Sequence, residues 1–521
     1  MKKSFLCISL QTAWILGIGV GLSGCALLDK IGLNDISKKF NPKTTLESVK
    51  PPANWQATLP HGGEISNLNE FWQRYPDPIL LEMIVLAQNN AATLATATAN
   101  LAEARANRIS ANASRLPKLD ANASYARALQ QPENTTFSGG GNNFGLINVP
   151  VDTTQVALQA VWELDLYGKN KALTDAAIKQ ETSANAGWHE ARVAVAAEVA
   201  TSYFNYLLCQ QLSSTEVAIA KSSFESARLT NIAFNAGFLD ASKQTIAQAN
   251  AADAKQQSSY QALQCELEVK NLTALTYLPE PQVREKLNTA QTNKPSIELE
   301  KLFIINEVPA QVLAQRPDIY RAEAELVRTA ANVKSATFDR YPKVTLNGSI
   351  GWTRLVSDIF ESKGRVWSLG PVSVTLPIFD GGILKASQNL AEARYTEAAA
   401  KYRDVIQTAV KEVENALINL HNTSERDADV QQVLLSFQAN LKSIEAKQKA
   451  GFASMIDVED AKRSLMQMQK TALTLQQARA NAWLNLYRAA GGGWEPNMSI
   501  EANNNPRNNP SPAKPKPDEV L

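Results

Sequence analysis

The sequence predicts an α+β membrane protein in which a few strands per chain continue into exceptionally long helices. Three observations predict this fold class. The chain is a tandem duplication, each copy contains two strand-length alternating stretches, and each copy then runs for about 67 residues in a helical pattern without a proline. At 1.5 Å per residue such a helix is about 100 Å long, which no compact domain requires.

The duplication is visible in the spacing of glycine motifs. The offset that aligns Gly382 with Gly168 also places Gly451 on Gly237, within a repeated Ala-Gly-Phe tripeptide. The two copies therefore stay in register across a long helix and the turn that follows it.

The stretches upstream of these glycines match with a larger offset. There Pro342 falls on Pro117, so that YPKVTLNGSIGW pairs with LPKLDANASYAR, and the change of offset falls in the loop between the two strands. We therefore expect one helix, strand, strand, long helix, helix unit to occur twice.

Five glycines are expected at sharp changes of chain direction. Gly168, Gly381 and Gly382 follow alternating runs and precede the long helices, so they are predicted strand-to-helix turns. Gly237 and Gly451 lie between a long helix and a returning one, and they are predicted hairpin tips.

Four alternating stretches are predicted strands, at roughly 118–130, 153–166, 343–354 and 365–378. Each is about as long as the 9 to 11 residues that a tilted strand needs to cross a bilayer. Because a membrane barrel needs about eight strands, the chain must contribute its strands to a shared barrel. A soluble four-stranded sheet is the alternative. Trp367 lies off the apolar parity of its own strand.

Residues 1–24 are predicted to be a lipoprotein signal peptide. Lys2 and Lys3 precede an apolar run that ends directly before Cys25. We expect Cys25 to be acylated and to anchor the mature chain in membrane lipid, with an ordinary secretory signal or a membrane helix as the alternatives. No later stretch approaches the roughly 18 apolar residues of a membrane helix.

Composition excludes several classes of function. Lys and Arg number 52 against 51 Asp and Glu, so no basic surface for nucleic acid is expected. The histidines, His61, His189 and His421, are not at metal-ligand spacing from one another or from a cysteine. There is no nucleophile elbow or phosphate-binding glycine loop, so we expect no metal, no cofactor and no enzyme.

The two cysteines that follow Cys25 lie on one predicted hairpin. Cys209 and Cys265 are equally far from Gly237 along the chain, on opposite arms. Antiparallel helices are at similar height at equal distances from their turn, so we expect the two thiols within bridging reach and bonded in an oxidising periplasm. Two small buried residues that face different ways are the alternative.

The remaining boundaries follow from helical pattern and proline. Residues 79–115 are predicted to form one helix that stops at Leu116-Pro117. The predicted organisation is a lipidated N-terminal strap at 25–78, a first repeat at 79–278, an inter-repeat equatorial segment at 279–316, a second repeat at 317–490 and a disordered tail at 491–521.

Together these motifs resemble the TolC-type outer membrane factor family, in its lipoprotein efflux branch, the NodT-like outer membrane components of RND efflux systems. The motifs are the lipobox at Cys25, Arg316-Pro317-Asp318, the strand sequences YPKVTLNGSIGW and LPIFDGG, and the paired Ala-Gly-Phe tips, and the resemblance covers roughly 65–495. It implies a homotrimer with one 12-stranded β-barrel in the outer membrane, continuous with a periplasmic α-helical coiled-coil barrel. The implied partners are a periplasmic adaptor (membrane fusion) protein and an inner-membrane RND-type pump.

The resemblance also implies a periplasmic gate at Asp457 and Asp460, which fall where the family carries acidic gate residues. Their spacing of three places both on one helix face, and threefold symmetry would make acidic rings that favour cations. Ser454 and Asp457 also match a capping box, a structural alternative that can coexist with the gate. The family's basic gate-locking residue is absent, since Ala453 stands there.

The implied function is a passive exit duct that conducts small toxic compounds from the adaptor and pump to the outside. Two alternatives are an outer membrane duct for protein or peptide secretion and a pore-less structural lipoprotein that spans the periplasm.

Overall fold

The computed structural model describes residues 39–49, 51–52, 55–57, 72, 77–130, 149–293, 309–358 and 361–494. The predicted signal peptide, Cys25, most of the strap, the loop at 131–148 and the tail beyond 494 lie outside the described residues. The chain divides into two compact units. Unit 1 comprises residues 1–48, 102–182 and 323–400, and unit 2 comprises the rest.

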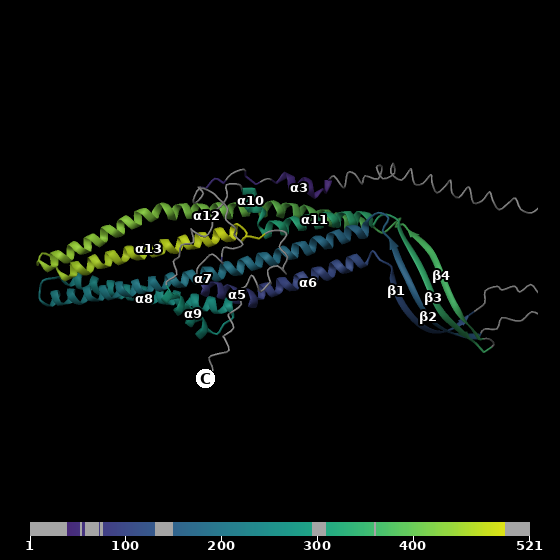
Figure 1. Cartoon of the computed structure of the whole chain (residues 1–521), viewed down its shortest axis with the longest axis horizontal. Helices are drawn as coiled ribbons and strands as arrows, with labels where there is room; N and C mark the ends of the chain where they lie inside the picture. The colour runs from purple at the N-terminus through teal and green to yellow at the C-terminus, as the bar shows by residue number, and fades with distance from the viewer. Residues whose placement is uncertain are drawn as a thin grey trace, which may run out of the picture. The chain divides into compact units, whose positions relative to one another are not determined.

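Unit 1 contains one antiparallel sheet with the strand order β1-β2-β3-β4 (Figure 1). The strands are β1 (Lys118–Gln130), β2 (Val149–Leu164), β3 (Lys343–Val356) and β4 (Glu361–Thr375). Each predicted strand is confirmed, with ends that move by up to four residues. β1 and β4 are the two edges of the sheet.

A β-bulge in β4 corrects the expected placement of Trp367. Leu346 pairs with Val372 whereas Gly348 pairs with Leu369, so β4 has one residue more than β3 between these pairs. An extra residue reverses which side chains point to each face of a sheet. Trp367 pairs with Ile350 and therefore shares a face with the apolar residues, although simple alternation placed it on the other.

The two longest helices have the predicted length and position. They are α7 (Lys169–Asn235) and α12 (Ile383–Lys449), with 67 residues each. Each returns through a second helix, α8 (Ala241–Thr276) or α13 (Met455–Ala489).

The helix predicted over 79–115 is broken. α5 (Pro78–Asn90) and α6 (Ala92–Ala113) meet at Ala91, whose ψ of 123° leaves the helical region, and the two helices are bent by 48°. In the described residues no single helix is long and apolar enough to cross a membrane. By length and composition only the bent pair of α5 and α6, taken together, is long and apolar enough.

The core of unit 2 lies where the long helices meet the shorter ones. Its largest buried side chains include Tyr203 and Phe204 of α7, Leu272 of α8 and Leu417 of α12. The inter-repeat segment adds α9 (Glu280–Asn293), whose Leu287 is fully buried. Two further helices, α10 (Pro309–Ala314) and α11 (Pro317–Phe338), precede β3.

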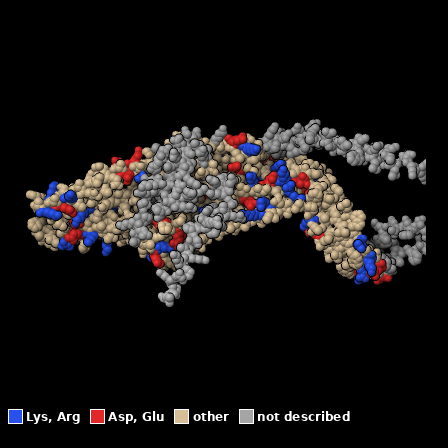
Figure 2. All heavy atoms as spheres, viewed as in Figure 1, with Lys and Arg blue, Asp and Glu red and all other residues tan. Residues whose placement is uncertain are grey.

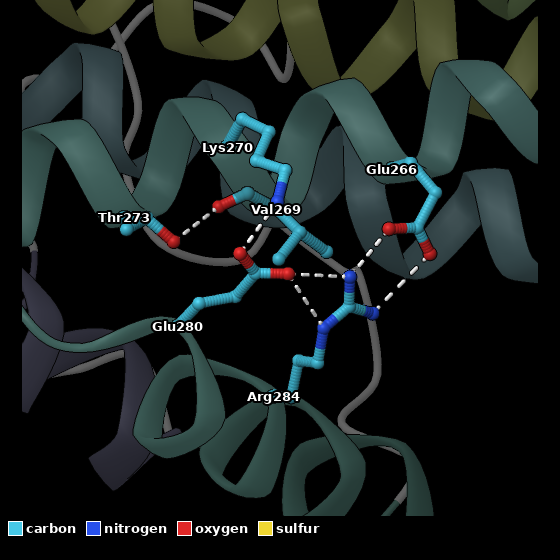
Figure 3. Close-up of polar contacts among 6 residues, drawn as sticks. All are labelled: Glu266, Val269, Lys270, Thr273, Glu280 and Arg284. Carbon is cyan, nitrogen blue, oxygen red and sulfur yellow. Dashed lines mark hydrogen bonds and ion pairs between the residues drawn. The ribbon is translucent and has the colours of Figure 1, made fainter.

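Charged side chains fasten α9 to its neighbour α8 (Figure 3). Arg284 donates hydrogen bonds to both Glu266 and Glu280, and the Nζ of Lys270 lies 2.5 Å from a carboxylate oxygen of Glu280. The Arg284 side chain is 38% exposed, so water screens these ion pairs. The burial of Leu287 and Val283 therefore holds α9 in place more than the charges do.

A buried arginine joins three helices at the start of the second repeat. The Nη1 of Arg316 donates to the carbonyl of Ala489 at 2.8 Å, and Nη2 donates to Glu412 at 2.8 Å and to Asp318 at 2.6 Å. The planar guanidinium can serve all three acceptors because its donors point in fixed, divergent directions.

Two parts of the predicted boundaries differ from the structure. The strap at 25–78 contains a short helix that the sequence analysis did not predict, α3 (Pro42–Ser48), in which the hydroxyl of Thr45 lies 2.8 Å from that of Tyr395. The tail was expected to begin at 491, but Trp494 is only 3% exposed and packs against the ring of Tyr320 with centroids 5.2 Å apart. Aromatic burial therefore orders the chain through Trp494.

Candidate functional site

The sheet of unit 1 has one apolar face and one polar face. The strand registers place the same class of side chain in each row, because paired residues point to the same side. The apolar face carries Leu119, Ala121, Ala123 and Tyr125 of β1, Val156, Leu158, Ala160 and Trp162 of β2, Leu346, Ile350 and Trp352 of β3, and Trp367, Leu369, Val372 and Val374 of β4.

The opposite face is lined by amides and hydroxyls. Asn122 Nδ2 donates to Gln159 Oε1 at 2.8 Å, and the hydroxyls of Ser349 and Ser368 lie 2.8 Å apart. A sheet with these two faces matches hydrocarbon on one side and water on the other, as in the wall of an aqueous membrane channel.

The predicted turn glycines have backbone angles that favour glycine. The φ angles are +82° at Gly168, +65° at Gly381 and +93° at Gly382, all in the left-handed region. Two carboxylates that the sequence analysis missed cap the N-termini of the long helices that follow these glycines. Asp165 accepts hydrogen bonds from the backbone N–H groups of residues 170 and 171, and Asp380 from those of residues 382 and 384. These bonds hold the pKa of Asp380 below its usual range.

The hairpin tips share one backbone motif. Gly237 N–H donates to Phe234 O and Phe238 N–H to Ala233 O, both at 2.9 Å, and the second tip repeats the pattern from Gly451 and Phe452. This is the Schellman arrangement that ends a helix at a left-handed glycine. It leaves Phe238 82% exposed and Phe452 85% exposed, so each tip presents one bare aromatic ring.

Asp457 forms the capping box that the sequence predicted as a structural role. Its carboxylate accepts a hydrogen bond from the Ser454 backbone N–H at 2.7 Å, and the Ser454 hydroxyl accepts one from the Asp457 N–H at 3.1 Å. The backbone hydrogen bond from Ser454 lowers the pKa of Asp457, so this carboxylate is firmly ionised at neutral pH.

Asp460 lies one turn further along α13 and is paired with Arg463. Its side chain is 55% exposed, whereas that of Arg463 is 26% exposed. Arg463 Nη1 also donates to the Ser226 hydroxyl of α7 at 2.5 Å. The structure therefore gives Asp460 a basic neighbour on its own helix, ten positions after Ala453 in the sequence.

Buried polar contacts between α7 and α13 were not expected from the sequence. Glu459 is 6% exposed and accepts a hydrogen bond from the Ser222 hydroxyl at 2.7 Å, while Glu216 is 4% exposed and lies 2.5 Å from the Nζ of Lys470. Both contacts join α7 to α13. No local pattern reveals them, because the partners in each pair are far apart in the sequence.

Cys209 and Cys265 are joined in the structure. Their sulfur atoms are 2.03 Å apart and their Cα atoms 5.5 Å apart, and both residues are buried. The bond links α7 to α8 within the first hairpin.

The family model described as "Outer membrane efflux protein" matches residues 83–276 and 308–492. The two matched segments correspond to the two repeats and together cover more than half of the chain. The chain belongs to the outer membrane efflux protein family.

Relatives in this family match over most of their length. The pyoverdine export outer membrane protein OpmQ of Pseudomonas putida is 27% identical over 463 residues, covering 87% of this chain and 94% of the relative. The cation efflux system protein CusC of Escherichia coli is 30% identical over 364 residues, covering 68% of this chain and 77% of the relative. The probable outer membrane lipoprotein SilC of Salmonella typhimurium is 28% identical, covering 81% and 88%.

Solved structures of efflux channels have the same fold. The open-state MtrE outer membrane channel of Neisseria gonorrhoeae has a TM-score of 0.67 at 26% identity, covering 86% of this chain and 97% of that one. The outer-membrane channel OprN has a TM-score of 0.72 at 23% identity, covering 86% and 98%, and supports the fold alone. As a member of the outer membrane efflux protein family, the chain is a channel protein of the outer membrane that extends into the periplasm, and it is not an enzyme.

Proposed function

We propose that three copies of this chain form the exit duct of a tripartite efflux system. The observation that carries the proposal is the sheet, which has an apolar and a polar face and two open edges, β1 and β4. An open edge in lipid leaves backbone groups unpaired, at several kcal/mol each, so the edges need partner strands. Four is an even number, so β1 and β4 run in opposite directions and β4 of one copy can pair antiparallel with β1 of the next.

In this proposal the duct is passive and its partners supply the energy. They are a periplasmic adaptor protein and an inner-membrane RND-type pump. The exposed rings of Phe238 and Phe452 support contact with the adaptor at the hairpin tips, because each offers an unburied apolar group beside a rigid turn. Cys25, acylated after signal cleavage, would add an anchor in outer membrane lipid.

The compounds conducted are proposed only as a class. Relatives are named for pyoverdine export, solvent efflux and cation efflux, so one architecture serves chemically unrelated compounds. We assign small toxic compounds to this duct and leave their selection to the pump.

The periplasmic mouth is proposed to be acidic. Asp460 carries the exposed carboxylate, while Asp457 is held in the capping box beside it. In a trimer each becomes a ring of three charges, and carboxylate rings favour cations. Arg463 partly neutralises Asp460, so the cation preference is expected to be modest.

Single-channel recording in planar bilayers tests the proposal. Wild-type protein should form a weakly cation-selective pore, and Asp460→Asn should shift its reversal potential in a salt gradient towards zero. Asp253→Asn removes an exposed carboxylate on α8 and serves as the matched control, which should leave selectivity unchanged. Equal selectivity in all three proteins would contradict the acidic mouth but not the duct. Folded trimers that form no channels would contradict the duct itself.

A further inference from the structure

Within the four strands, the apolar face of the sheet ends in charged residues at one end only. Four cationic side chains point to this face. They lie near the connections between β1 and β2 and between β3 and β4, at the opposite end of the sheet from the strand ends that join helices. Figure 2 shows this charged end beside a band of uncharged atoms. We call these residues the cationic collar: Arg127, Arg354, Lys363 and Arg365.

The collar carries more positive charge than its acidic neighbours can balance. Arg127 lies 3.6 Å from Asp152, and Arg354 lies 2.9 Å from Glu361. Within the described strands and turns, neither Lys363 nor Arg365 has an ion-pair partner. Asp358 of the adjoining turn is a third carboxylate, so among the described residues the four cations leave an excess of one positive charge on each chain.

The strand registers place the collar at the edge of the apolar band. Val344 and Trp352 mark the two ends of this band on β3, and the eight residue steps between them span about 27 Å along the strand at about 3.4 Å per residue. At the strand tilt of about 40° that is usual in membrane barrels, they rise about 21 Å across the membrane. This is comparable with the roughly 25 Å apolar height of a membrane strand sheet. Lys363 lies one row beyond Trp352. Arg365 lies in the row of Trp352 itself, and its long side chain can extend outward to the headgroups.

At the opposite end the four strands carry no cation on this face, and the nearest one, Arg115, lies in the turn before β1, where its carbonyl accepts a hydrogen bond from the Trp162 indole N–H. The face finishes there in Leu164, Val344 and Val374, and the two lysines nearby, Lys118 and Lys343, have the parity of the polar face. The helices leave the sheet at this end, so the collar is at the end away from the periplasm.

We infer that the cationic collar binds the phosphate groups of a phosphorylated glycolipid in the outer leaflet. Guanidinium and ammonium groups at the edge of hydrocarbon form charge-assisted hydrogen bonds with phosphate oxygens, and arginine can do so with two bonds at once. The one-sided placement favours a lipid confined to the outer leaflet over a phospholipid common to both. The inference rests on the proposed function, because it requires the sheet to span the membrane.

Native mass spectrometry of the purified, detergent-solubilised full-length protein tests the inference. Bisphosphorylated lipid A, the same lipid without phosphates, and phosphatidylglycerol are the probes. The variant is Lys363→Gln with Arg365→Gln, and the matched control is Lys118→Gln with Lys343→Gln, which removes two cations from the polar face. Wild type and control should retain bisphosphorylated lipid A, and the variant should bind it about tenfold more weakly.

Three results would overturn the inference: equal weakening in the control, equal retention of the phosphate-free lipid, or equally tight binding of phosphatidylglycerol. Measuring the channel conductance of the same wild-type sample distinguishes a failure of the lipid-binding inference from a failure of the proposed function. A sample without channels contradicts the duct itself, whereas conducting channels that ignore the lipid phosphates contradict only the collar.

Discussion

At the residue scale, glycines and capping carboxylates decide where the chain can turn or approach itself. Gly351 in β3 is the tightest case in the sheet. A Cβ atom at this position would lie 2.5 Å from the carbonyl oxygen of Val156 and 2.6 Å from the Cβ of Ala157. The close approach of β2 and β3 therefore depends on a missing side chain.

Gly351→Ala should disrupt the sheet. The added methyl meets backbone atoms of β2, which cannot move without breaking the pairing, so we expect a marked loss of heat-resistant oligomer in outer membrane fractions. Gly348→Ala is the matched control on the same strand, because its Cβ would lie at an ordinary 3.6 Å from the Ser368 carbonyl. Equal yields of the two variants would show that β2 and β3 tolerate the contact.

The capping box at Asp457 predicts a pH dependence of the first turn of α13. The pKa of this carboxylate is lower in the folded protein than its usual 3.8, so the box stabilises the helix above about pH 4 and is lost as the pH falls through the folded pKa. Amide hydrogen exchange near residue 457 should be faster in Asp457→Ala than in wild type at pH 7, after correction for intrinsic rates. The difference should disappear below the folded pKa. A difference that persists there would mean that ionisation is not the cause.

At the element scale, the duplication contains information that local patterns lack. The break between α5 and α6 was missed because Ala91 and Ala92 carry no helix-breaking signal. The second copy does carry one, since α11 begins at Pro317 after Arg316. The offset of the upstream stretches also places Pro317 on Ala92, the first residue of α6, and both helices have 22 residues.

The bond between α7 and α8 should be the strongest single stabiliser of the first hairpin. Cys209 and Cys265 are separated by 56 positions in the sequence, and loop-closure entropy gives an upper estimate of about 4 kcal/mol for such a cross-link. Cys209→Ala with Cys265→Ala should lower the free energy of unfolding in denaturant by up to this amount.

Thiol labelling checks the bond directly. Denatured, unreduced wild-type protein should take up no label at these two cysteines, and a reductant should destabilise wild type but leave the double variant unchanged. Two labelled thiols without reductant would show that the bond does not form in the cell.

At the scale of the whole molecule, the sequence predicted the elements better than the contacts between them. Strand and helix positions follow from periodicity and from proline and glycine, which act locally. The bulge beside Trp367 and the buried Glu459 could not be predicted, because each depends on a neighbour that is distant in sequence. The pairing of Asp460 with Arg463 was within reach, since residues three apart on a helix are neighbours.

Mixed oligomers test the shared barrel. Cells that express tagged and untagged chains together should yield four species with zero to three tags, because one closed sheet of twelve strands requires three copies with four strands each. Native mass spectrometry of the extracted complexes should resolve these species. Only two species, or three, would indicate a monomer or a dimer and would contradict the twelve-stranded count.

The equal length of α7 and α12 has a consequence for how such a gene can vary. One residue added to either helix would rotate every following side chain by about 100° and move it about 1.5 Å along the axis, so the glycine tips would no longer match. The loop between the first two strands has no such constraint, and this is where the two copies differ in length. Insertions and deletions should therefore accumulate in the loops while the helices drift only by substitution.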